Sequence, residues 1–179
     1  MIFGDPYKFA VLVEHIPEWS GHGFKNGLFH YFIDGEMFPD KIVTATLNVE
    51  SVFLDDGNSL VSFPENGELF EAPKEDAFKA MLAMISPELV DANAEVPEEF
   101  ESSYIYLAAT PTSTDAGFYF FCVTYGDFVR IVGARIHSKK QDMFGSWYWE
   151  TEQVLHVQEV FLKKEQVREV IDQVINYCQ

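Results

Sequence analysis

The side chains of this sequence that could carry out chemistry are few and widely spaced. Cys122 lies in an apolar run, residues 118–123, whereas a catalytic thiol needs a partly exposed, electropositive setting. No phosphate-binding glycine loop, nucleophile elbow or paired-cysteine motif occurs. We therefore predict no catalytic residue, no metal ligand, no cofactor and no enzymatic activity, although a distant histidine could still meet Cys122 in the fold. The histidines are scattered and form no metal-binding pair: His15, His22, His30, His137 and His156.

Two short acidic segments invite a chemical interpretation. Asp55-Asp56-Gly57-Asn58 resembles the opening of a calcium loop, but it lacks the alternating ligands and the closing glutamate of an EF-hand. Glu98 and Glu99 could serve acid–base catalysis, yet no apolar surroundings that would raise their pKa are visible in the sequence. We interpret the first segment as a tight turn and both as solvated surface charge.

The distribution of charge is the strongest compositional signal. The chain has 179 residues and a formal net charge of −17. Residues 1–127 contain 22 acidic and five basic side chains, whereas residues 128–179 contain seven of each. Such acidity repels nucleic-acid phosphates and anionic lipid, so we expect a basic protein partner and neither nucleic acid nor membrane. The alternative is that the charge only keeps the protein in solution.

Acids in predicted turns and loops are the candidates for a partner-binding surface, because loops on a rigid sheet commonly carry binding. They lie within the acidic part of the chain, and the neutral last third is expected to contribute little charge. The predicted partner-binding acids are Asp55, Asp56, Glu65, Glu68, Glu71, Glu98, Glu99 and Glu101.

Trp147-Tyr148-Trp149 is the one aromatic motif that points to binding. In a strand, Trp147 and Trp149 lie on one face and Tyr148 on the other. The two indoles either cap the core or form an exposed anchor for a partner, since Trp and Tyr are enriched at binding hot spots.

The order of the predicted elements indicates the fold class. Strands and helices do not alternate regularly, so a doubly wound parallel sheet is excluded. Helices are expected after Pro73, ending at Ser86, and over residues 163–178, where apolar residues recur at helical spacing. We predict an α+β fold, a mostly antiparallel sheet with helices packed on one face. The expected strands are residues 8–14, 28–33, 36–38, 42–54, 60–63, 69–71, 104–109, 117–125, 128–137 and 147–162.

The length of the chain suggests a single domain spanning residues 1–179. Cys122 and Cys178 are the only cysteines and are expected to be buried free thiols, which suits a reducing compartment. The first residues lack the features of a signal peptide, and no apolar run is long enough to span a bilayer. We therefore expect a cytoplasmic protein.

The N-terminal third resembles a known family. Gly4-Asp5-Pro6-Tyr7-Lys8-Phe9-Ala10, then Trp19, the segment 24–35 (FKNGLFHYFIDG) and Phe38-Pro39 resemble immunity protein 42 of bacterial polymorphic-toxin and contact-dependent inhibition systems. The resemblance covers about the first fifty residues. It implies a cytosolic antidote, without catalysis, that binds a cognate toxin domain and blocks its active site.

Toxins of this kind are often basic nucleases, which an acidic antidote would capture rapidly by mimicking phosphate. The principal alternative is a small-molecule-binding or regulatory domain with an aromatic-lined site. A weaker alternative is a small hydrolase with a composite active site.

Overall fold

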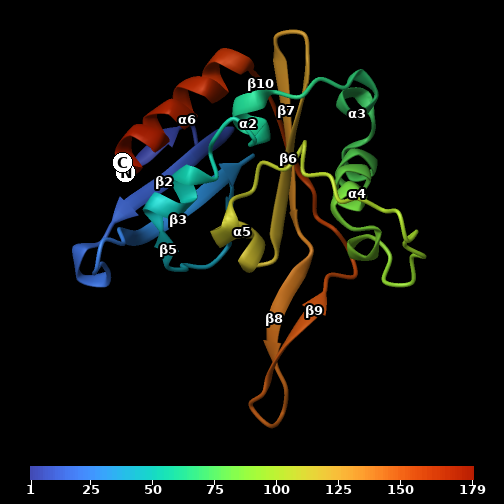
Figure 1. Cartoon of the computed structure of the whole chain (residues 1–179), viewed down its shortest axis with the longest axis horizontal. Coiled ribbons are helices and arrows are strands. Elements are labelled where there is room, and N and C mark those ends of the chain that lie inside the picture. The colour runs from blue at the N-terminus through green and yellow to red at the C-terminus, as the bar shows by residue number, and fades with distance from the viewer.

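The computed structural model describes residues 1–179 and contains three antiparallel sheets (Figure 1). The α+β class and the antiparallel pairing are confirmed. The first sheet has the order β1 (Ile2–Gly4), β2 (Phe9–His15), β3 (Asn26–Ile33), β4 (Glu36–Phe38), and β5 (Ala45–Thr46) pairs with the other end of β3. The second has the order β10 (Gln158–Lys163), β7 (Phe128–Arg135), β6 (Phe118–Tyr125), and the third is β8 (His137–Gln141) with β9 (Trp147–Thr151).

Both long helices occur where the apolar spacing predicts them. The α4 helix (Lys74–Ile85) and the α6 helix (Lys164–Cys178) each bury one apolar stripe. Stripes of this kind form because residues three and four apart share a helix face. The shorter helices are α1 (Leu47–Val52), α2 (Ser59–Ser62), α3 (Gly67–Glu71) and α5 (Pro111–Asp115), with 3₁₀ turns η1 (Pro17–Trp19) and η2 (Pro87–Leu89).

The apolar core lies on both faces of the second sheet, formed by β6, β7 and β10. Strand side chains alternate between the two faces of a sheet. Phe120 and Ile131 therefore belong to a cluster with α6 and the first sheet, whereas Phe121 and Val132 belong to a cluster with α4. Figure 1 accordingly shows α6 and α4 on opposite sides of the long β6–β7 ribbon. This sheet is therefore the centre of the molecule, and the third sheet continues from the end of β7.

The prediction of one strand over residues 42–54 is wrong. The chain forms only the two-residue β5 there and continues as α1. Leu47, Glu50 and Leu54 are buried, at the spacing of a helix face. The β-branched residues in between favoured a strand in the sequence, but burial against β3 and α6 outweighed that preference.

The strands predicted over residues 60–63 and 69–71 are helices instead. The Asn58 side chain accepts a hydrogen bond from the Leu60 amide at 2.9 Å, and the Asn66 side chain accepts one from the Leu69 amide at 3.0 Å. These asparagines are N-caps, which satisfy amides that a helix start leaves free. The same side-chain chemistry also favours asparagine in tight turns, which is the role predicted for Asn58 in the segment 55–58.

Two further strand predictions need correction. Residues 104–109 run beside β6 and share backbone hydrogen bonds with it, but they form an isolated bridge, Leu107 to Phe121, instead of a strand. The predicted strand over residues 147–162 is divided into β9 and β10, which belong to different sheets. Residues 152–157 change direction between them.

Candidate partner-binding surface

The β8–β9 hairpin is the most exposed apolar feature of the chain. It continues from the end of β7 and projects away from the remainder of the molecule (Figure 1). Trp147 is 61% exposed and Trp149 is 51% exposed. Neither belongs to an apolar core cluster, so the interpretation that they cap the core is wrong.

The turn of this hairpin is held in one conformation by Asp142. One carboxylate oxygen of Asp142 accepts hydrogen bonds from the amides of Phe144 and Ser146, both at 2.8 Å. Gly145 has φ of 84°, a left-handed conformation that glycine adopts without strain. As a result Met143 and Phe144 stand in solvent, 89% and 86% exposed.

A groove of about 430 Å³ lies between the hairpin and the loop that follows β4. Trp147 and Trp149 line one side of it, as strand alternation requires, and Lys139 lies over the Trp147 ring at 5.7 Å. Residues 39–41, 43 and 44 also line it, among them Asp40 and Lys41. The groove therefore combines aromatic surface with charges of both signs.

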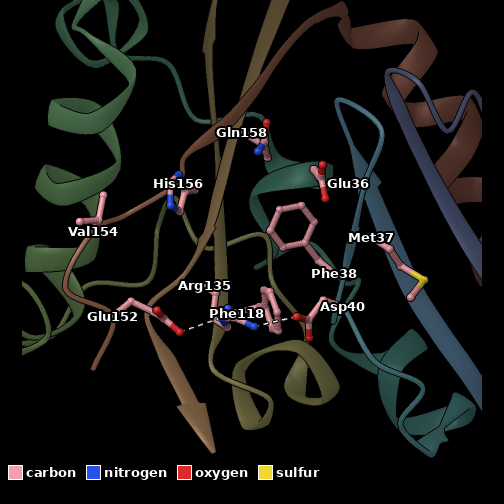
Figure 2. A pocket seen from close by; sticks show the side chains of 10 residues that line it. All are labelled: Glu36, Met37, Phe38, Asp40, Phe118, Arg135, Glu152, Val154, His156 and Gln158. Atoms are coloured by element: carbon pink, nitrogen blue, oxygen red, sulfur yellow. Dashed lines mark hydrogen bonds and ion pairs between the residues drawn. The ribbon is translucent and has the colours of Figure 1, made fainter. Parts of the chain in front are cut away.

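Arg135, at the end of β7, stabilises the base of the hairpin through contacts with distant residues. Its guanidinium forms ion pairs with Asp40 at 2.7 Å and with Glu152 at 2.9 Å, and it lies over the Phe118 ring at 5.7 Å (Figure 2). A smaller hollow of about 160 Å³ is also lined by these groups. The cation thus joins the loop after β4 to the end of β9 and fixes the direction in which the hairpin projects.

All eight predicted partner-binding acids are exposed, but they lie in three separate segments of the chain. Asp55 and Asp56 lie between α1 and α2, and Asp55 borders a hollow beside the end of α6. The second segment lies at and before α3, on the other side of the β6–β7 ribbon (Figure 1), and the third follows η2. The second segment carries Glu65, Glu68 and Glu71, and the third carries Glu98, Glu99 and Glu101. None of the eight acids belongs to an ion pair.

The cysteines are free and buried, as predicted. Burial raises the pKa of the Cys122 thiol far above its usual range and that of Cys178 to about 11. Both therefore remain protonated at neutral pH and pack as small apolar groups. No histidine forms a hydrogen bond with either thiol.

Glu50 is an acid that the fold removes from the surface. It is 2% exposed, and it accepts hydrogen bonds from the Thr112 hydroxyl at 2.6 Å and the Thr112 amide at 3.1 Å. Burial raises the pKa of this carboxyl. It lines none of the hollows described above.

No group of three or more histidine, cysteine or acidic side chains is arranged to hold a metal ion. None of the helices combines the length and the apolar character required to cross a membrane.

Sequence reasoning missed Arg135 and the tip pair Met143 and Phe144. The tip could have been noticed, because Asp142-Met143-Phe144-Gly145 places two large apolar residues inside a turn signal. Arg135 gave no local signal, since its partners Asp40 and Glu152 are distant in the sequence.

Comparisons with known proteins give one family and one solved structure of similar fold. The family model described as Immunity protein 42 matches residues 1–177. A crystal structure of CdiI from Burkholderia dolosa has 23% sequence identity and a TM-score of 0.71, with 99% of each chain covered. No curated protein matches the chain significantly. The structural likeness supports the fold, and the family match supports membership.

Proposed function

Because the chain belongs to the immunity protein 42 family, we propose that it binds one cognate bacterial toxin domain and neutralises it. In this proposal residues 1–179 act as one cytoplasmic binding domain without catalysis. The toxin is a basic nuclease, and the bound antidote covers its active site. The CdiI structure supports the proposal at the level of fold.

The observation that carries the proposal beyond family membership is the unpaired surface acidity. The eight predicted acids are exposed and have no cationic partner within the chain. A surface of this kind attracts a basic partner over distances up to about the Debye length, roughly 8 Å at physiological salt. A nuclease active site is basic because it binds phosphate, so it is complementary to acidic segments of this kind.

We expect co-expression of the chain with its cognate toxin domain to restore growth of the host cell. The Val170→Asp variant, which is expected not to fold, serves as the negative control. Continued growth arrest with both proteins present and folded would contradict the proposal. An in vitro nuclease assay of the purified pair separates a nuclease target from other toxic activities.

The acids are expected to govern the rate of association. Replacing Asp55 and Asp56 with Asn, or Glu98 and Glu99 with Gln, should slow binding to the toxin domain about 3- to 10-fold at low salt, because complementary charge steers encounter. The difference should shrink at high salt. Stopped-flow binding measures these rates.

Glu169→Gln with Asp172→Asn provides the matched control, since both acids are exposed on α6 in the neutral part of the chain. This double variant should associate at close to the wild-type rate. If neither acidic pair slows association and salt has no effect, charge does not bring the two proteins together.

A further inference from the structure

We propose that the tip of the β8–β9 hairpin inserts into a concave apolar site on the toxin domain and determines how long the complex lasts. This inference rests on the proposed function and goes further by naming the element that anchors the partner. The acids would then bring the partner to the surface, and Met143 and Phe144 would hold it.

The exposure of the hairpin is the first support. Five large apolar or aromatic side chains, residues 143, 144 and 147–149, are each 46% or more exposed within seven positions. Large apolar side chains exposed so close together mark an interaction site in a folded protein. The tip is convex and projects from the body, so the matching surface of the partner must be concave.

Preorganisation is the second support. The Asp142 carboxylate fixes the turn through two amides, Gln141 donates from its side chain to the Gly145 carbonyl at 2.8 Å, and Arg135 ties the base to two carboxylates. An isolated two-stranded hairpin is marginal in water, yet this one is braced at both ends. Less conformational entropy is then lost on binding, which favours affinity.

Charge identifies the occupant as a basic protein. A second copy of this chain also carries −17, and nucleic acid and anionic lipid are negative as well, so long-range repulsion opposes all three. A basic toxin domain is attracted by the acidic body while its apolar site receives the tip.

The hairpin itself contributes no net charge. Residues 137–151 contain Lys139, Lys140, Asp142 and Glu150 as their only charged side chains, and Lys140 is ion-paired with Glu150 at 2.5 Å. Apolar contacts made by the tip should therefore affect dissociation and should depend little on salt, in contrast to the contribution of the acids.

The test is the Met143→Ser, Phe144→Ser double variant of the full chain, measured against the toxin domain by surface plasmon resonance. The dissociation rate should rise about 30-fold or more, the effect of losing a binding hot spot. The association rate and its salt dependence should stay within about threefold of wild type. Because both side chains are exposed, the urea midpoint should be unchanged.

Tyr7→Ser is the matched control, since Tyr7 is 84% exposed in the turn between β1 and β2. It should dissociate at the wild-type rate. If the wild type binds the toxin domain and the tip variant dissociates no faster than Tyr7→Ser, this inference is overturned while the proposed function stands. If the wild type does not bind at all, the proposed function fails.

A wild-type dimer in sedimentation velocity that the tip substitutions convert to monomer would also overturn the inference. It would assign the hairpin to contacts between copies of this chain.

Discussion

Arg130→Met should lower the free energy of unfolding by about 3–5 kcal/mol, the usual effect of removing one partner from a buried ion pair. The Arg130 side chain is 3% exposed and pairs with Glu159, to which its Nε donates at 2.7 Å. Its Nη1 donates to the carbonyls of Leu69, Phe70 and Ala72 at 2.8, 2.9 and 2.7 Å. Methionine would fill much of the space but leave these oxygens without a donor.

The same contacts connect α3 and its C-cap residue Ala72 to β7. Loss of Arg130 should therefore also loosen the segment that carries Glu68 and Glu71, which hydrogen exchange of the α3 amides would detect. Urea unfolding gives the stability. Arg168→Met is the control, because Arg168 is exposed on α6 and lies over the Phe63 ring. Equal stability of the two variants would show that Arg130 is not an anchor.

Val170→Asp should prevent stable folding. Val170 is 8% exposed on the buried stripe of α6, within the apolar cluster that joins α6 to the first sheet and to β7 and β10. An unpaired carboxylate there costs several kcal/mol even if it becomes protonated. That loss is a large part of the 5–15 kcal/mol that stabilises a typical domain.

Circular dichroism and size-exclusion chromatography of the purified variant measure the outcome. Gln173→Asp introduces the same carboxylate on the exposed face of α6 and should leave stability within about 0.5 kcal/mol of wild type. A folded Val170→Asp protein with near wild-type stability would mean that α6 does not hold the core together.

The hairpin of β3 and β4, the long β6–β7 pair and both long helices could be predicted because their signals are local. Asp34-Gly35 marks a two-residue turn, and the apolar residues of α4 and α6 recur at helical spacing. Family resemblance in the first fifty residues extended to a family match over residues 1–177. The identity and exposure of the eight candidate acids also followed from their positions in polar segments.

The remaining features depend on contacts between distant segments. α1 and α2 replaced predicted strands because side chains such as Leu47 and Leu60 are buried against other elements, which local propensity does not register.

By itself, the sequence determined the net charge, the family, the two buried thiols and the elements whose apolar period is regular. Only the tertiary structure decided that Trp147 and Trp149 face a groove instead of the core, because alternation says which residues share a face but not what covers that face. It also decided that Arg135 joins Asp40 to Glu152. The physical reason is the same in both cases: burial and ion pairing depend on which strands become neighbours, and neighbours are chosen by the packing of the whole chain.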